Sequence, residues 1–186
     1  LQGWYSPDGL KNLYESNVKD SVNHLKSESA DFLQNDTGLS LRDYQLKAIV
    51  KLEEKLINQP EDRRYLIAMA TGTGKTRTII GLCYRLIQSN RFRRILFLVD
   101  RRILAKQAMD FFKDNRIVGL NTFSEIYDVK GLKEAIPDID TRLHFATVQG
   151  MVQRIFYNDG TDIPPVDQYD CIIIDEAHRG YLLDKE

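Results

Sequence analysis

The sequence predicts an α/β fold, a doubly wound and mostly parallel sheet that follows an N-terminal helical segment. Apolar runs of strand length alternate with stretches in which apolar residues have helical spacing. A glycine-rich loop joins the first of these runs, at residues 65–70, to the helix that follows. The last run ends in two adjacent carboxylates, Asp175 and Glu176. Because ligands of open α/β sheets bind at the carboxyl ends of the strands, we expect a binding site there.

The composition is that of an ordinary globular protein, with 42% hydrophobic and 28% charged residues among 186. No apolar run approaches the ~18 residues that suggest a membrane-spanning helix, so no membrane segment is expected. Cys83 and Cys171 stand singly in apolar segments, which favours burial over a disulfide or a metal site and a reducing, cytoplasmic location. The net charge of −1 gives no overall nucleic-acid signature, so DNA binding has to be argued from local features.

Residues 1–37 are predicted to form a helical attachment segment, and residues 38–186 a separate lobe. Pro7 suits the first turn of a helix, and apolar residues follow it at helical spacing as far as Leu25. Residues 35–38 are typical of a turn between the two parts.

A second helix is expected over residues 39–58, with Ser40 or Asp43 as its cap. Four residues are spaced along its predicted apolar face: Tyr44, Ala48, Leu52 and Leu56. Gln45 is expected to be a surface residue, although its amide offers the donor and the acceptor that match the edge of adenine.

The next segment predicts a phosphate-binding loop. Residues 65–70 have the length and apolar character of a strand, and residues 69–76 read Met-Ala-Thr-Gly-Thr-Gly-Lys-Thr. The two glycines permit the positive φ angles with which backbone N–H groups converge on a phosphate at a helix start. Lys75 would reach the β and γ phosphates, and Thr76 would hold Mg²⁺. The residues expected to bind the nucleotide phosphates are Thr71, Gly72, Thr73, Gly74, Lys75 and Thr76.

The alternative for this segment is a glycine-rich turn before an ordinary helix. The general pattern has glycine at its first position, where this chain has Met69. The succession of a strand-like run, two spaced glycines and Lys-Thr nevertheless satisfies the context that a phosphate loop requires.

The middle of the chain continues the alternation. From residue 75 to residue 90 the apolar side chains are too dense for a one-sided surface helix, so this helix should be packed against a sheet. Residues 95–99 predict a buried parallel strand and residues 103–113 a helix. A short strand is expected at 116–123 and a helix at 124–136.

The last third predicts a strand at residues 142–147, a helix at 148–157 and a long loop at 158–168. His144 lies inside the strand and is expected to be a satisfied core histidine rather than a catalytic one.

The acidic pair ends a buried strand that starts at residue 169. Asp175 is placed to hold the Mg²⁺ that bridges the phosphates, and Glu176 to orient or deprotonate the attacking water. An acidic pair after a strand is also common as a helix start. Its occurrence a hundred residues after a phosphate loop favours a site that hydrolyses nucleoside triphosphates.

These motifs resemble those of superfamily 2 helicases and translocases, whose motors are built from RecA-like lobes. More narrowly, four segments resemble the restriction (R) subunit of type I restriction-modification enzymes. They are Leu-Arg-Asp-Tyr-Gln at 41–45, Phe-Leu-Val-Asp-Arg-Arg at 97–102, Phe-Ala-Thr-Val-Gln at 145–149 and Asp-Glu-Ala-His-Arg-Gly-Tyr at 175–181. The resemblance runs from about residue 39 to the end of the chain.

The resemblance implies the first RecA-like lobe of a motor that hydrolyses ATP with Mg²⁺ and pulls double-stranded DNA before endonuclease cleavage. Methylation and specificity subunits would be its partners. Gln45 would read adenine, and His178 would couple the nucleotide site to DNA or to the second lobe. The positions of DNA-backbone contacts would be Asp100, Arg101, Arg102, Thr147 and Gln149. Without the resemblance, the arginines between residues 91 and 102 are interpreted as a solvated basic surface.

The sequence holds neither a carboxylate-rich nuclease motif before residue 39 nor the second motor lobe with its arginine. We therefore expect residues 1–186 alone to bind ATP weakly and to hydrolyse it negligibly. Two other functions stay open: an excision-repair type superfamily 2 helicase, which shares the form of the phosphate loop, and a non-catalytic nucleotide-binding scaffold domain.

Overall fold

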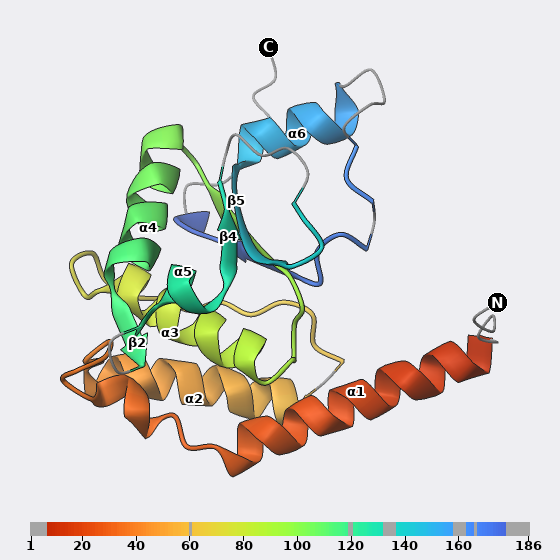
Figure 1. The fold of residues 1–186 in the computed structure, drawn as a ribbon, viewed down its shortest axis with the longest axis horizontal. Helices are drawn as coiled ribbons and strands as arrows, with labels where there is room; N and C mark the ends of the chain where they lie inside the picture. Colours follow the sequence, from red (N-terminus) through yellow and green to blue (C-terminus); the bar gives the residue numbers. More distant parts are fainter. Residues whose placement is uncertain are drawn as a thin grey trace. The chain divides into compact units, whose positions relative to one another are not determined.

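The computed structural model describes residues 7–59, 61–118, 121–131, 137–157, 163–165 and 167–177. The chain divides into two compact units, Leu1–Arg91 and Phe92–Glu186. The first contains α1 (Pro7–Ser27), the 3-10 helix η1 (Asp31–Gln34), α2 (Asp43–Asn58) and α3 (Lys75–Gln88). The helices of the second are α4 (Arg102–Asp114), α5 (Phe123–Ile126) and α6 (Val148–Phe156) (Figure 1). No described helix is long and apolar enough to cross a membrane.

Helix α2 begins at Asp43 rather than at residue 39. Its N-cap is Arg42, and Ser40 has a φ of 50°, a left-handed conformation that does not continue into a helix. The prediction of Ser40 or Asp43 as the cap was therefore wrong. Of the predicted apolar face only Leu56 is buried, because the buried residues of α2 are Gln45, Ile49, Glu53 and Leu56. Two of these four are polar, and a pattern of apolar residues does not detect them.

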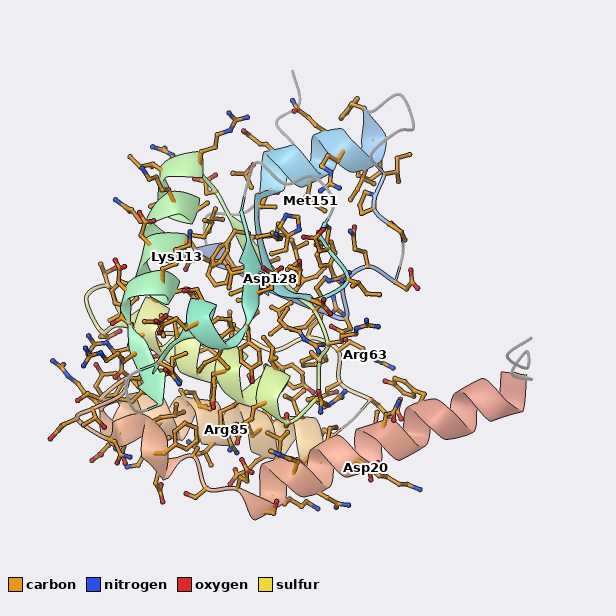
Figure 2. All side chains as sticks on the ribbon, in the orientation of Figure 1. Asp20, Arg63, Arg85, Lys113, Asp128 and Met151 are labelled. Atoms are coloured by element: carbon orange, nitrogen blue, oxygen red, sulfur yellow. The ribbon has the colours of Figure 1, made fainter. Side chains whose placement is uncertain are left out.

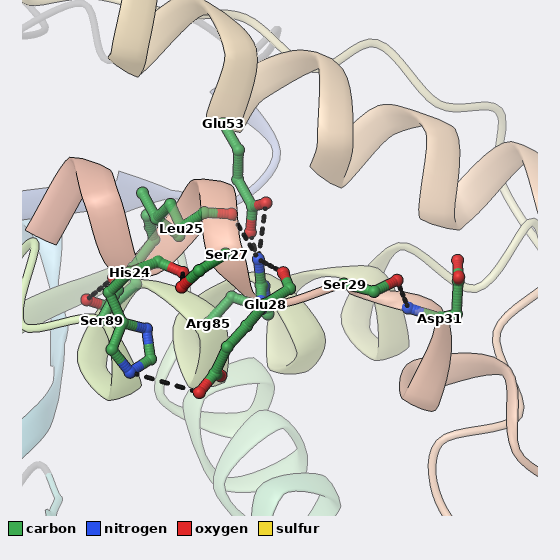
Figure 3. A network of polar contacts seen from close by, with 10 residues as sticks. His24, Leu25, Ser27, Glu28, Ser29, Asp31, Glu53, Arg85 and Ser89 are labelled. Carbon is green, nitrogen blue, oxygen red and sulfur yellow. Dashed lines mark hydrogen bonds and ion pairs between the residues drawn. The ribbon is translucent and has the colours of Figure 1, made fainter.

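A buried ion pair ties the three α-helices of the first unit together (Figure 3). The guanidinium of Arg85 in α3 donates to both carboxylate oxygens of Glu53 in α2, at 2.8 and 3.0 Å. The same guanidinium donates to the backbone carbonyl of Glu28, just beyond α1, at 2.9 Å. The two side chains are only 2% and 6% exposed. Their mutual contacts compensate charges that are costly to bury alone.

Replacing Glu53 by alanine is expected to lower the free energy of unfolding by about 3–5 kcal/mol, since Arg85 would keep a buried charge without its carboxylate. Chemical denaturation measures this change. Glu54→Ala is the matched control, because Glu54 is the exposed neighbour on the same helix and should change stability by about 0.5 kcal/mol or less. Equal effects of the two substitutions would contradict a structural role for the ion pair.

Residues 65–70 do not form the predicted strand. The segment has no regular secondary structure, and Leu66 is 84% exposed. A strand exists only with a hydrogen-bonded neighbour, and none of the described strands pairs with this segment. The apolar character of the run was therefore not sufficient evidence for a strand. Helix α3, which follows, is buried around most of its surface, in agreement with its dense apolar pattern.

The second unit is built on a four-stranded sheet in the order β4-β5-β1-β6, and every neighbouring pair is parallel. The strands are β1 (Ile95–Val99), β4 (Asp128–Lys130), β5 (Thr141–Thr147) and β6 (Cys171–Ile174). Val99 lies opposite Thr147, and Leu98 lies opposite Ile174. The carboxyl ends of β1, β5 and β6 therefore meet at one edge. The predicted α/β class with a parallel sheet is confirmed.

Helices cover both faces of this sheet (Figure 1). On the face of α4 and α5, four phenylalanine rings contact one another at centroid distances of 5.1 to 6.1 Å. They are Phe97, Phe112, Phe123 and Phe145. On the opposite face, Leu96 and Ala146 pack against Met151, which Figure 2 places beneath α6. Successive residues of β1 thus point to opposite layers, as the alternation of a strand requires. This two-sided cover confirms the doubly wound arrangement.

The region between α4 and β5 differs most from the prediction. Two short antiparallel strands, β2 (Arg116–Val118) and β3 (Asn121–Thr122), replace the single strand expected there. The helix predicted for residues 124–136 is only the four-residue α5, because residues 128–130 pair with β5 instead. Residues 132–136 lie outside the described part of the chain. Sheet pairing outweighed local helical spacing in this segment.

Arg94 holds the amino edge of the sheet and is not part of a solvated basic surface. Its guanidinium donates to four backbone carbonyls, those of Asp138, Ile139, Thr141 and Gln168. The carboxylate of Asp170, just before β6, accepts the amide N–H groups of Arg93 and Arg94 at 2.6 and 2.9 Å. The interpretation as a solvated arginine was wrong for this residue.

The predicted burial of His144 is confirmed, since it is 1% exposed. Its Nδ1 hydrogen-bonds to the hydroxyl of Tyr169. Burial raises the pKa of Tyr169 above its ordinary value of 10.0, so the phenol stays protonated at neutral pH. Cys83 and Cys171 are both free thiols; Cys83 is fully buried as predicted, whereas Cys171 is only half-buried, so the prediction of burial was wrong for it.

Candidate nucleotide-binding site

The glycine-rich loop of the first unit has the conformation that a phosphate loop needs. Gly72 has a φ of 78° and Gly74 a φ of 79°, which side chains larger than glycine rarely adopt. The hydroxyl of Thr73 donates to the carbonyl of Ala70 at 2.6 Å and closes the turn between them. Gly74 is the N-cap of α3, with no side-chain hydrogen bond to the first turn.

The charges at the start of α3 favour an anion. The first turn holds no acidic residue, whereas Lys75 and Arg77 both stand in it. A cation at the positive end of a helix dipole is unfavourable by about 0.3–1 kcal/mol. Because the first N–H groups of a helix also have no partners within it, a phosphate group would satisfy the amides and compensate the two cations.

Gln45 contacts this loop, contrary to its predicted position on the surface. It is 3% exposed, and its Nε2 donates to the carbonyls of Thr73 at 3.1 Å and Gly74 at 3.0 Å. A Cβ atom on Gly74 would lie 2.6 Å from the same Nε2. The positive φ therefore favours glycine at position 74, and a Cβ there would displace the end of the Gln45 side chain from the loop. The prediction failed because a segment 28 residues later in the chain covers the side chain.

The amide of Gln45 is largely occupied by the protein itself. Both of its N–H donors bond to the loop, and its Oε1 accepts the N–H of Arg42 at 2.8 Å. Recognition of adenine takes one donor and one acceptor. The oxygen has a second lone pair for this purpose, but one N–H would have to leave the loop. We therefore keep adenine recognition by Gln45 as a proposal, which requires that one of its N–H groups leaves the loop.

Tyr44 is a loop contact that the sequence analysis missed. It is 43% exposed, and its hydroxyl donates to the carbonyl of Thr73 at 2.8 Å. The apolar pattern had assigned Tyr44 to the buried face of α2. Its place directly before Gln45, in the quoted segment 41–45, was the signal that could have identified it.

The second unit presents the acidic pair at the carboxyl edge of its sheet. The N–H of Asp175 donates to the carbonyl of Leu98 at 2.9 Å, and the N–H of Glu176 donates to Oδ1 of Asp175 at 2.9 Å. Glu176 has a φ of 53°, a left-handed conformation that costs a non-glycine residue about 1–3 kcal/mol and is concentrated at functional sites. The backbone therefore directs two carboxylates to the edge where ligands of such sheets bind.

The five proposed DNA contacts lie at the same edge. Arg101 and Arg102 are exposed at the start of α4, and Nε of Arg101 is 3.6 Å from Oδ2 of Asp100. Thr147 ends β5, and its Oγ1 accepts the N–H of Gly150 at 3.0 Å as the cap of α6. A hydroxyl that accepts in this way retains its own O–H as a donor. Gln149 is exposed in the first turn of α6, and His178 lies outside the described residues.

No group of three or more His, Cys, Asp and Glu side chains within the described ranges is arranged to hold a metal ion. Magnesium that accompanies a nucleotide needs fewer protein ligands, since one or two oxygens act with the phosphates and water. The hydroxyl of Thr76, in the first turn of α3, and the carboxylate of Asp175, after β6, are donors of this kind.

Comparison with known proteins identifies close relatives. The family model described as "Type III restriction enzyme, res subunit" matches residues 38–183. The chain is 53% identical over 188 residues to the "Type I restriction enzyme EcoKI endonuclease subunit" of Escherichia coli (strain K12), a match that covers 100% of this chain and 15% of the relative. It is 35% identical over 155 residues to the EcoAI endonuclease subunit of Escherichia coli, with 81% of this chain and 17% of the relative covered.

A third relative is the SauCOLORF180P type I endonuclease subunit of Staphylococcus aureus (strain COL), at 28% identity over 152 residues, 78% of this chain and 15% of the relative. These matches confirm the resemblance to the restriction subunit of type I enzymes. The chain spans about one sixth of the length of the relatives that it matches.

Proposed function

Because the chain belongs to the family described as "Type III restriction enzyme, res subunit", we propose that it is the first RecA-like lobe of an ATP-driven motor that translocates double-stranded DNA. The motor belongs to the restriction subunit of a type I system and acts before endonuclease cleavage. The 53% identity to a type I endonuclease subunit supports this system over an excision-repair helicase.

The loop and the acidic pair have separate tasks in this proposal. Amides of residues 72–76 cradle the phosphates, and Lys75 neutralises the charge of the β and γ groups. Thr76 and Asp175 are the protein ligands of Mg²⁺, which supplies further neutralisation of the phosphates when bound. Glu176 accepts a proton from the attacking water or orients it.

The DNA contacts are assigned to the carboxyl edge of the sheet. Arg101 and Arg102 provide exposed positive charge there, and Thr147 and Gln149 provide hydroxyl and amide donors. Groups of these types bind phosphate oxygens without reading sequence. Recognition of a DNA site would therefore fall to a specificity subunit, and modification to a methylation subunit, in the assembled complex. His178 is proposed to couple ATP hydrolysis to DNA or to a second lobe.

The main support for the proposal is the phosphate loop itself. Gly72 and Gly74 have positive φ angles, and the helix that follows has cations and no acid in its first turn. The test is ATP turnover by the full-length protein, assembled with its partner subunits, with and without double-stranded DNA. We expect DNA to stimulate turnover and a DNA-bound third strand to be displaced as the motor moves. Absence of ATP turnover would favour the non-catalytic scaffold alternative, and separation of the duplex strands would favour the excision-repair helicase.

A further inference from the structure

Tyr44 and Gln45 approach the same part of the phosphate loop from the start of α2. The Tyr44 hydroxyl donates to the carbonyl of Thr73 at 2.8 Å, and Nε2 of Gln45 donates to the carbonyls of Thr73 and Gly74. The carbonyl of Gly74 also accepts the N–H of Thr78 as the first bond of α3. Two side chains of α2 thus donate to the carbonyl of Thr73 and orient this peptide.

In a trans peptide the C=O and N–H groups are antiparallel in one plane. The carbonyl of Thr73 shares its plane with the N–H of Gly74, and the carbonyl of Gly74 shares its plane with the N–H of Lys75. Donors that hold these two carbonyls toward α2 therefore direct the two amides to the opposite side. These are the amides at the start of α3, where an anion would bind.

The glycines make this restraint necessary. Gly72 and Gly74 flank Thr73, and glycine allows large changes of φ at little cost. A rotated Thr73–Gly74 peptide would present a carbonyl oxygen to the phosphates instead of an N–H, which is electrostatically unfavourable. An orientation fixed before the nucleotide arrives avoids the cost of ordering the loop on binding.

We propose that Tyr44 is a positioning residue of the phosphate loop, whose hydroxyl orients the Thr73–Gly74 peptide so that its N–H faces the phosphates. The inference rests on the proposed function, in which this loop binds a nucleotide. Tyr44 acts on the phosphate side of the ligand, whatever its base. Gln45 shares this task and is in addition the proposed adenine contact.

The test is Tyr44→Phe in the full-length protein, which removes one oxygen from a half-exposed ring. Titration calorimetry is expected to give Kd values for ATP and GTP that both rise by the same factor, about two- to tenfold. Because the loss concerns binding in ground and transition states alike, KM should rise while kcat is retained. Gln45→Ala, in contrast, should change the ratio of ATP to GTP affinity.

Tyr65→Phe is the matched control. The hydroxyl of Tyr65 donates to the carbonyl of Asp62 at 2.9 Å, so the variant loses a hydrogen bond of the same kind outside the phosphate loop. It should leave both Kd values unchanged. If both variants lose the same nucleotide affinity, the effect of Tyr44→Phe reflects general stability, and the inference is overturned.

Hydrogen exchange of the nucleotide-free protein provides a second measurement. The amides of residues 73–75 should exchange faster in Tyr44→Phe than in the wild type, because the peptide is less restrained. If Tyr44→Phe changes neither the exchange rates nor the affinity while Lys75→Ala loses binding, the proposed role of Tyr44 is wrong. The assignment of the phosphate loop is then retained. If Lys75→Ala also binds and hydrolyses ATP normally, the proposed function itself fails.

Discussion

Replacement of Lys75 by alanine is expected to lower ATP turnover on the order of 10²- to 10³-fold, the effect of removing one preorganised donor from a site of charge development. Its ammonium is the charge proposed to neutralise the β and γ phosphates at the start of α3. DNA translocation and cleavage by the assembled enzyme should be lost with it. Steady-state hydrolysis by the full-length protein, with saturating Mg²⁺ and DNA, measures the change.

The control for this variant is Lys51→Ala, which removes an exposed lysine from α2. It should retain both turnover and stability. A folded Lys75→Ala protein with the turnover of the wild type would contradict the assignment of residues 71–76 as the phosphate loop.

Glu176→Gln is expected to slow hydrolysis on the order of 10²- to 10⁴-fold while ATP still binds, because the amide keeps the shape of the carboxylate but accepts no proton. ATP should therefore accumulate unhydrolysed on the protein. The variant retains the backbone cost of the left-handed φ of 53°, so its stability should differ little from that of the wild type. Single-turnover kinetics separate the binding step from the chemical step.

Asp175→Asn is the companion variant, since its side chain is the proposed Mg²⁺ ligand. It should weaken nucleotide binding in the presence of Mg²⁺ and change binding little in its absence. If the two variants behave identically in titrations with and without Mg²⁺, the division of roles between the carboxylates is wrong.

The sequence predicted the sheet of the second unit well. The runs at residues 95–99 and 142–147 became the two central strands β1 and β5, and central parallel strands are apolar because both of their faces are covered. The run at residues 171–174 became the edge strand β6, in which Ile172 and Ile174 are 58% and 44% exposed, so the prediction that this strand is buried was wrong. The same logic failed for residues 65–70. An apolar run becomes a strand only when a neighbour pairs with it, and pairing is a property of the whole fold.

Polar contacts between distant parts of the chain could not be predicted from the sequence. Arg85 and Glu53 lie 32 residues apart on different helices, and nothing in either helix alone indicates that the charges would meet in the core. Gln45 was assigned to the surface for the same reason. The covering residues, Thr73 and Gly74, belong to a loop whose position on α2 cannot be read from local spacing.

The residues of the candidate site were nevertheless identifiable, because their chemistry imposes local rules. A phosphate loop needs glycines at positive φ before a helix, and both glycines have it. An acidic pair that follows a parallel strand has to lie at the carboxyl edge of the sheet. No such rule identifies Tyr44, since a tyrosine at helical spacing cannot be distinguished from other apolar residues by its position in the sequence.

Hydrogen–deuterium exchange with and without ATP tests most directly whether the phosphates bind to this loop. We predict that, in the full-length protein with Mg²⁺, ATP slows exchange of the amides of residues 72–76, and that Lys75→Ala loses this protection. ATP hydrolysis by a protein in which these amides exchange at the same rate with and without nucleotide would contradict the account.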